Sequence, residues 1–203
     1  MANPGIIPYN GETHYDLSIG TIERRLPVIR LNPVTWIASF VMLGDVALIE
    51  HCAELLCRKV SPDYDVIAVP EAKAIPLAHS MARLCGRADY CVMRKSVKSY
   101  MSGELSVPVD SITTGRRQRL YLDGADAERI KGRRVLLVDD VISTGGTLAA
   151  CAGLIEAAGG RLHQAASALM EGEAWAGAVG SYGTRPAVHL AAIPVFVTPD
   201  GAA

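Results

Sequence analysis

The sequence predicts an α/β protein with a doubly wound, mainly parallel sheet. Three short apolar runs, 66–69, 90–93 and 135–138, have the continuous hydrophobic character of strands that are buried on both faces. Helical patterns follow the first run over 75–85 and the third over 146–158. This alternation is typical of an open sheet with right-handed crossovers. A chain of 203 residues is long enough for one such unit with an appended subdomain.

The segments on either side of these runs predict further elements. Residues 1–20 are rich in Pro, Gly and Asn and are expected to form an irregular arm. A helical pattern begins at Asn32 and Pro33, and a second helix follows over 45–59, where apolar residues recur on one face. Two later runs, 165–170 and 188–197, can supply more strands, and Pro194 makes the last one an edge strand.

Residues 96–131 form a long excursion between two predicted strands. A compact fold rarely leaves about 35 residues there unless they have a function. The runs 107–114 and 118–122 surround Gly115, so we expect a mobile β-hairpin. The basic clusters at 115–119 and 133–134 are interpreted as loop-tip and solvated charges in preference to a nucleic-acid site.

Composition and charge exclude several classes of protein. Half of the residues are hydrophobic, 20% are charged and the formal net charge is −1, which fits an ordinary globular protein and not a general nucleic-acid binder. The N-terminus lacks the pattern of a signal peptide, and the longest apolar stretch, 36–43, is far shorter than the roughly 20 residues of a membrane span. We therefore expect a cytoplasmic protein with no membrane or nucleic-acid partner. Five cysteines match no zinc or redox spacing and are expected to be small buried side chains: Cys52, Cys57, Cys85, Cys91 and Cys151.

The strongest motif follows the third core strand. Asp139 and Asp140 stand at the end of that strand, and a loop of hydroxyl and glycine residues leads into the next helix. Such a loop can surround one monoester phosphate with backbone N–H groups at a helix N-terminus, while the two carboxylates accept hydrogen bonds from vicinal hydroxyls. A ribose 5-phosphate fits this pairing. The alternative is that the acidic pair and the glycines only turn the chain. The loop residues are Ser143, Thr144, Gly145, Gly146 and Thr147.

This run resembles the binding signature for 5-phosphoribosyl 1-pyrophosphate (PRPP) in type I phosphoribosyltransferases. The resemblance implies the fold of that family, with Asp139 and Asp140 on the ribose hydroxyls and the loop on the 5′-phosphate. It also implies Mg²⁺ as a cofactor, bound mainly by PRPP with no direct protein ligand, although the two aspartates can reach it through water.

Two further stretches extend the resemblance. Glu71, Ala72 and Lys73 are similar to the family's pyrophosphate loop, where Lys73 takes the position of an arginine, and the loop often carries a cis peptide bond in the family. The alternative for Lys73 is a surface lysine at a turn. The run 94–98 looks like the opening of the flexible catalytic loop in adenine-type enzymes, and its alternative is a solvated basic patch. Its cations, expected to converge on the pyrophosphate leaving group, are Arg94, Lys95 and Lys98.

The resemblance leaves the acceptor base open. Adenine phosphoribosyltransferases carry Glu-Tyr-Gly in the mobile loop, whereas 112–115 here contains no carboxylate, so Glu104 or Asp110 would have to substitute for the glutamate. The base is expected to contact an N-terminal hood, through residues that are similar to the segment used against adenine. These are Val28, Ile29 and Arg30.

The sequence therefore predicts a single phosphoribosyltransferase domain over 1–203, with an N-terminal arm and hood at 1–33 and a flexible catalytic loop at 96–131. The expected reaction transfers phosphoribosyl from PRPP to a purine-like base, of the adenine type, and gives a nucleoside 5′-monophosphate and pyrophosphate. Two alternatives stay open: a non-catalytic regulator that binds PRPP, and a biosynthetic enzyme for a modified purine-like base. Family analogy implies a homodimer.

Overall fold

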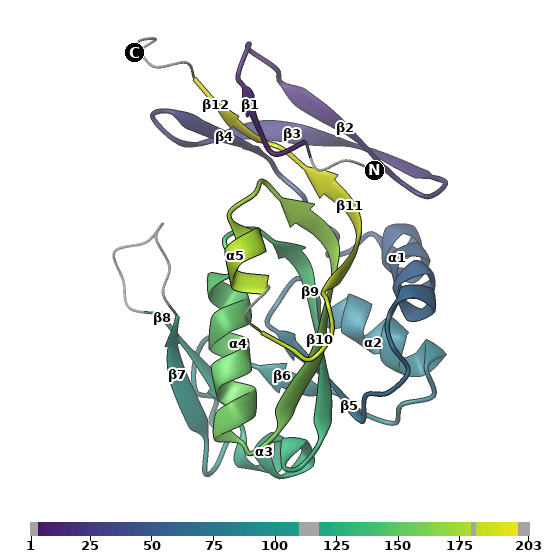
Figure 1. The fold of residues 1–203 in the computed structure, drawn as a ribbon, viewed down its shortest axis with the longest axis vertical. Helices are drawn as coiled ribbons and strands as arrows, with labels where there is room; N and C mark the ends of the chain where they lie inside the picture. Colours follow the sequence, from purple (N-terminus) through teal and green to yellow (C-terminus); the bar gives the residue numbers. More distant parts are fainter. Residues whose placement is uncertain (1–3, 110–117, 180–181, 199–203) are drawn as a thin grey trace.

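A five-stranded parallel sheet forms the centre of the molecule (Figure 1). The computed structural model describes residues 4–109, 118–179 and 182–198. The strand order is β11-β10-β9-β5-β6, and helices cover both faces, so the predicted α/β architecture is confirmed. The five strands are β5 (Val66–Pro70), β6 (Cys91–Met93), β9 (Arg134–Ile142), β10 (Arg161–Glu171) and β11 (Val188–Ile193).

Two hydrophobic cores lie on opposite faces of this sheet. Helices α1 (Val46–Lys59) and α2 (Ile75–Leu84) pack on Ile67 and Val69, while α4 (Gly146–Ala157) packs on the alternate residues Val66 and Ala68. Every residue of β5 is buried because it lies between two helical layers, which explains its unbroken apolar run. These three helices agree with the predicted ones to within one residue at each end. In the part of the chain that the structure describes, no helix is long and apolar enough to cross a bilayer.

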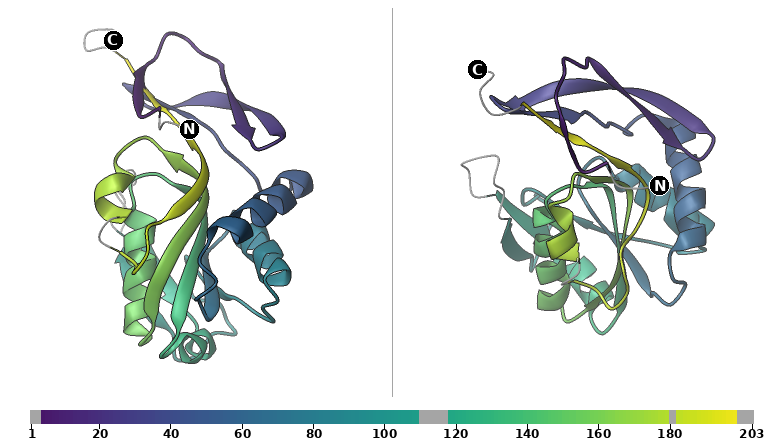
Figure 2. Two further views of the ribbon diagram at one scale, coloured as in Figure 1. Left: turned by 45° about the vertical axis from the view of Figure 1, so that its right-hand side comes forward. Right: turned by 45° about the horizontal axis from the view of Figure 1, so that its top comes forward.

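A second sheet lies over the carboxyl ends of the parallel strands and is called the hood (Figures 1 and 2). Its order is β1-β12-β4-β3-β2, so the first and last strands of the chain pair with each other. The prediction of an irregular arm over 1–20 is therefore wrong. Pro8 is accommodated because β1 is an edge strand. The hood strands are β1 (Ile6–Pro8), β2 (His14–Ile19), β3 (Ile22–Asn32), β4 (Thr35–Ala38) and β12 (Val195–Val197).

The helix predicted to begin at Asn32 and Pro33 is also wrong. These residues form the turn between β3 and β4, which are antiparallel. The Asn32 side-chain oxygen accepts a hydrogen bond from the Val34 backbone N–H at 3.0 Å, so the asparagine closes a local turn where a helix cap was expected. Pro194 separates β11, at the edge of the parallel sheet as predicted, from β12 in the interior of the hood.

The excursion contains an antiparallel pair, β7 (Leu105–Val109) and β8 (Gln118–Leu122), in agreement with the predicted hairpin. It also contains a short helix, α3 (Gly124–Ile130), that the sequence did not predict. The pair packs against α4, where Val107 lies 3.8 Å from the position of a Cβ on Gly153. Residues 110–117, with Asp110, the 112–115 stretch and most of the basic cluster, lie outside the described residues.

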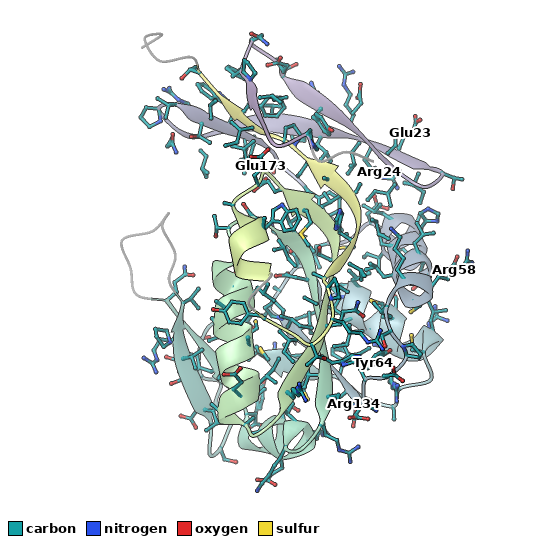
Figure 3. The ribbon with its side chains drawn as sticks, viewed as in Figure 1. Glu23, Arg24, Arg58, Tyr64, Arg134 and Glu173 are labelled. Atoms are coloured by element: carbon teal, nitrogen blue, oxygen red, sulfur yellow. The ribbon has the colours of Figure 1, made fainter. Side chains whose placement is uncertain are left out.

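The hood is tied to the body by an ion pair. Arg24 of β3, labelled in Figure 3, donates two hydrogen bonds to Asp45, at 2.7 and 3.0 Å. Asp45 also caps α1 by accepting from the Leu48 N–H at 3.1 Å. A single carboxylate therefore fixes the start of α1 and the orientation of β3.

Candidate active site

The acidic pair lies inside β9, which runs through both residues and ends at Ile142. The prediction that the pair ends the strand is wrong, because β10 continues to pair alongside it, with Ser167 opposite Asp139 and Met170 opposite Ile142. Asp139 accepts a hydrogen bond from the Asp140 backbone N–H at 2.9 Å. Burial, followed by the adjacent Asp140 carboxylate, raises the pKa of Asp139 well above its usual range. Hydroxyl donors or a cation beside the pair would therefore stabilise its ionised form.

The predicted phosphate loop forms a small cavity at the N-terminus of α4. Gly145 has φ of 84°, a left-handed conformation that places the turn directly before the helix. The cavity has a volume of about 100 Å³. Its size and the backbone N–H groups at the start of the helix suit one phosphate group. It is lined by Asp139, Val141, Ile142, Ser143, Thr144, Gly145, Gly146, Thr147 and Leu148.

A second cavity adjoins the first and brings the predicted motifs together. Its volume is about 180 Å³, and it shares Asp139, Val141 and Thr147 with the phosphate cavity. The peptide bond between Glu71 and Ala72 is cis, as the resemblance implies. The lining residues are Pro70, Glu71, Ala72, Lys73, Lys95, Asp139, Asp140, Val141 and Thr147. One continuous site therefore has a hydroxyl-rich end and an end with two lysines.

Glu71 holds the segment 94–98 beside the site. Its carboxylate accepts hydrogen bonds from the Lys95 N–H at 2.7 Å and from Arg94 at 3.3 Å, and Lys98 lies at 3.9 Å. Burial raises the pKa of Glu71, but these three contacts outweigh that effect and leave it lowered. Lys95 and Lys73 line the cavity, while Arg94 and Lys98 are directed to Glu71. Of the three predicted cations, Lys95 lines the cavity, and their convergence on one leaving group stays a prediction.

The hairpin is attached directly to this segment. The Arg94 N–H donates to the Tyr121 carbonyl at 2.7 Å, and the Tyr121 N–H donates back at 2.8 Å. A displacement of β8 would therefore move the backbone next to Lys95. Glu104, one of the two suggested substitutes for the missing loop glutamate, is exposed just before β7, at the end of the hairpin opposite its tip.

The hood presents an apolar row toward the site. Ile29 pairs with Ile37, and Ile37 pairs with Val195, so the three side chains share one face of the sheet. Val195 lies 2.9 Å from the position of a Cβ on Gly172, the residue that follows β10. Ile29 is 44% exposed and available for contact.

The other two predicted base contacts lie on the opposite face of the hood. Val28 packs against the core that includes α1. The Arg30 guanidinium donates to the carbonyls of Asn32 and Pro33 at 3.1 and 2.8 Å and lies 5.3 Å from the Trp36 ring. The side chains of Val28 and Arg30 therefore lie on the face of β3 opposite to Ile29, since side chains alternate along a strand, and their contact with a base stays a prediction.

Glu171 is a site residue that sequence reasoning missed. It ends β10, next to β9 in the sheet, and it is half-buried. Burial raises the pKa of its carboxyl, while a hydrogen bond from Ser143 and the charge of Lys73 oppose that rise. Glu171 thus lies near both loops. A glutamate directly after a long apolar strand next to the motif-bearing strand was the available signal.

Comparison with known proteins agrees with this geometry. A family model described as the phosphoribosyl transferase domain matches residues 45–173. A hypoxanthine/guanine phosphoribosyltransferase of Methanothermococcus okinawensis is 34% identical over 142 residues, covering 70% of this chain and 72% of the relative. A protein of the same name from Methanococcus voltae is 34% identical over 137 residues, covering 68% and 69%. The chain belongs to the phosphoribosyltransferase family, and it is an enzyme of the glycosyltransferase type.

Solved structures identify the fold more closely. The adenine phosphoribosyltransferase of Thermoanaerobacter pseudethanolicus superposes with a TM-score of 0.62 at 23% identity, covering 73% of this chain and 82% of its own. The adenine phosphoribosyltransferase of Rhodothermus marinus gives 0.61 at 19% identity, covering 89% and 94%. The fold is that of the type I phosphoribosyltransferases.

Proposed function

We propose that this protein transfers phosphoribosyl from PRPP to a ring nitrogen of a purine base, giving a nucleoside 5′-monophosphate and pyrophosphate. One observation carries the proposal: the cavity formed by the loop 143–148 adjoins a second cavity lined by Asp140, Lys73 and Lys95, and Asp139 lines both. This order of groups matches a 5′-phosphate, a ribose diol and a pyrophosphate along one substrate. Relatives that are 34% identical are named for purine bases, which supports the choice of acceptor.

Each group has a role in this reaction. The loop 143–147 binds the 5′-phosphate, and Asp139 and Asp140 accept hydrogen bonds from the ribose hydroxyls. Lys73 and Lys95 stabilise the negative charge that develops on pyrophosphate as the bond at ribose C1 breaks. Ile29 covers one face of the base. Closure of the hairpin would exclude water from the site. This matters because hydrolysis competes with transfer.

The cofactor implied by the fold is Mg²⁺, and the residues present suit an indirect role. Among the described residues, no group of three or more metal-binding side chains occurs. As the family resemblance implies, PRPP would provide most of the Mg²⁺ ligands. The raised pKa of Asp139 fits a carboxylate pair that a nearby cation stabilises in its ionised form. Bound Mg²⁺ would supply positive charge at the pyrophosphate, and Asp139 and Asp140 would hold it through water.

Hypoxanthine and guanine are the acceptors that we place ahead of adenine. The sequence predicted adenine, but the loop lacks the glutamate of the adenine type. In addition, relatives that align with more than two thirds of this chain are named for hypoxanthine and guanine. The adenine enzymes are below 25% identical and support the fold alone.

A base panel tests the activity. Pyrophosphate release is measured with PRPP, Mg²⁺ and one base at a time: hypoxanthine, guanine, adenine or none. We expect base-dependent release with the first two. Binding of PRPP with no pyrophosphate release for any base would favour a regulator. Pyrophosphate release with adenine alone would show that the acceptor is adenine, as expected from the sequence.

For assembly we propose a homodimer, for which sedimentation equilibrium should give twice the 21.6 kDa of the chain.

A further inference from the structure

The interface between α1 and α2 places two cysteines side by side. The sulfur of Cys57, in the last turn of α1, lies 2.9 Å from the sulfur of Cys85, which directly follows α2. A disulfide bond is about 2.05 Å long, so a shift of about 1 Å brings the two atoms to bonding distance. Both side chains are half-buried, whereas Cys52, Cys91 and Cys151 are 0% exposed. The pair is therefore both preformed and reachable by a small reagent.

We propose that Cys57 and Cys85 form a site of reversible oxidation, at which a peroxide joins α1 to α2 through a disulfide bond. One thiolate attacks a peroxide oxygen, which breaks the O–O bond, gives a sulfenic acid and releases water after protonation. The second thiol then attacks the sulfenic sulfur, forms the S–S bond and releases a second water. The net change is two thiols and hydrogen peroxide to one disulfide and two waters, and a thiol reductant reverses it.

The surroundings of Cys57 keep its thiol protonated. Burial, followed by the hydrogen bond and charge of Cys85, raises the pKa of Cys57 to about 12. The thiolate is therefore rare at neutral pH, and oxidation is slow relative to that of an activated cysteine. Tyr64 also belongs to this interface. The pKa of its hydroxyl is raised by burial and then by the Cys85 thiol. The Met81 carbonyl lies 3.8 Å from the Cys57 sulfur.

The cross-link would enclose a functional part of the chain. Cys57 and Cys85 are 28 positions apart, and β5, the pyrophosphate loop and α2 lie between them. Closing a loop of this length restricts the unfolded chain and stabilises the folded one. From the size of that effect, we expect the oxidised protein to melt roughly 5 to 10 °C above the reduced protein.

Peroxide treatment of the folded, full-length protein tests this proposal. After oxidation and alkylation of free thiols, intact mass should show the loss of two hydrogen atoms and three alkylated cysteines per chain. Non-reducing peptide mapping should join the peptides of Cys57 and Cys85, and a reductant should restore both the mass and the lower melting temperature. Cys151→Ser is the matched control, which should keep the cross-link.

Two single variants make the test independent of any one substitution. Cys57→Ser and Cys85→Ser should each lose the disulfide and the rise in melting temperature, while the reduced forms fold like the wild type. The proposal is overturned if both thiols of the wild type are alkylated after oxidation, if the joined peptides contain another cysteine, or if the bond links two chains.

Discussion

Asp139, inside β9, and Glu171, at the end of the neighbouring strand β10, are carboxylates with raised pKa values. A protein keeps a half-buried carboxylate at such a place at a cost in stability, because desolvation penalises its charge. Under the proposed function, the compensating partners of Asp139 would be the ribose hydroxyls and Mg²⁺. For Glu171 the compensating partners already belong to the protein, namely Ser143 and Lys73. We therefore assign Glu171 a positioning role between the two loops.

Glu171→Gln tests this role. The KM for PRPP should rise about 5- to 10-fold, since one charge-assisted interaction is lost, while the KM for the base changes less than about twofold. In the wild type, PRPP binding should weaken as pH falls through the raised pKa of Glu171. The variant should lack this pH dependence. Glu156→Gln, an exposed position on α4, is the control. Equal effects on both KM values would argue against positioning.

Gly145→Ala tests the phosphate loop. An alanine at φ of 84° costs about 1 kcal/mol or more, so the free energy of unfolding should fall and PRPP affinity should drop by at least about tenfold. Gly153→Ala in the same helix is the control, because a Cβ there lies at an ordinary 3.8 Å from Val107 and helix propensity should raise stability. Unchanged PRPP affinity in Gly145→Ala would contradict the assignment. Urea denaturation and calorimetry provide the two measurements.

The sequence predicted the site residues that belong to continuous motifs. Asp139 to Thr147 begins within β9 and continues into α4, and Glu71 to Lys73 follows β5, so their chemistry could be recognised from local order. Glu171 belongs to no motif and depends on which strands are neighbours. Ile29 and Arg30 lie on opposite faces because they belong to a strand, and that strand depends on pairing within the hood that local sequence patterns do not reveal.

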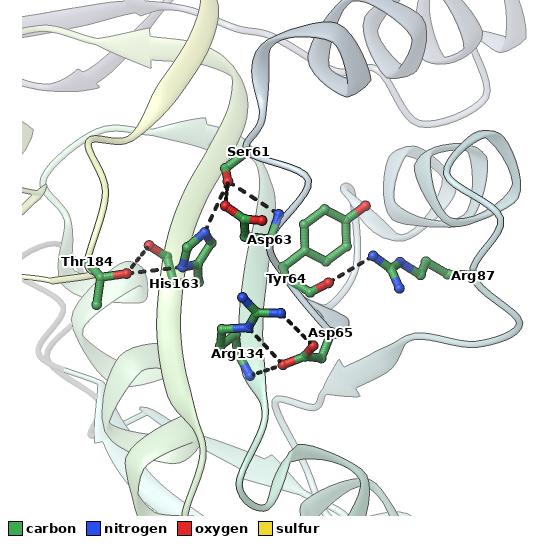
Figure 4. Close-up of polar contacts among 8 residues, drawn as sticks. All are labelled: Ser61, Asp63, Tyr64, Asp65, Arg87, Arg134, His163 and Thr184. Atoms are coloured by element: carbon green, nitrogen blue, oxygen red, sulfur yellow. Dashed lines mark hydrogen bonds and ion pairs between the residues drawn. The ribbon is translucent and has the colours of Figure 1, made fainter.

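At the scale of elements, a polar network joins the amino ends of the central strands to neighbouring loops (Figure 4). His163 of β10 contacts the hydroxyls of Ser61 and Thr184 at 3.3 and 3.1 Å. Asp65 accepts hydrogen bonds from the Arg134 side chain at 3.1 and 3.0 Å, which lowers the pKa of Asp65 to about 2. The network lies far from the phosphate loop along β9 and is expected to serve stability.

His163 predicts a pH dependence of stability. Burial, followed by the charges of Arg185 and Arg134, lowers its pKa below the ordinary 6.5. The folded protein thus binds this proton less readily than the unfolded chain, so the contribution is present above pH 6.5 and is lost as pH falls below it. Urea denaturation at pH of about 7.5 and about 5.5 should show a larger decrease in the wild type than in His163→Gln. An identical decrease in both proteins would contradict this.

The strands and helices that bury a regular apolar face were predictable. The 45–59, 75–85 and 146–158 helices have their own periodicity and were found within one residue. The hood was not predictable in the same way, because β1 is stabilised by pairing with β12, far away in the sequence. Prolines lie in β1 and β3 and glycines lie beside the strands, so local propensity indicated an arm and a helix where tertiary pairing decides the structure.

At the scale of the whole molecule, the proposed function requires the hood to keep a fixed position over the parallel sheet, where it would contact the base. Asp45 links the two by capping α1 and pairing with Arg24. Asp45→Ala removes both interactions and should lower the free energy of unfolding by about 1 to 2 kcal/mol. Asp45→Asn keeps the cap and loses the charge, so its effect should be smaller. Urea denaturation measures both, and equal losses would show that the cap has no separate effect.

Calorimetric titration of PRPP in the presence of Mg²⁺ tests the central claim most directly. The wild type should bind PRPP, and the double variant Asp139→Asn, Asp140→Asn should lose that binding while its melting temperature stays the same or rises, because a buried carboxylate pair is removed. The variant should also release no pyrophosphate with any base. Wild-type affinity for PRPP in the double variant would contradict the account.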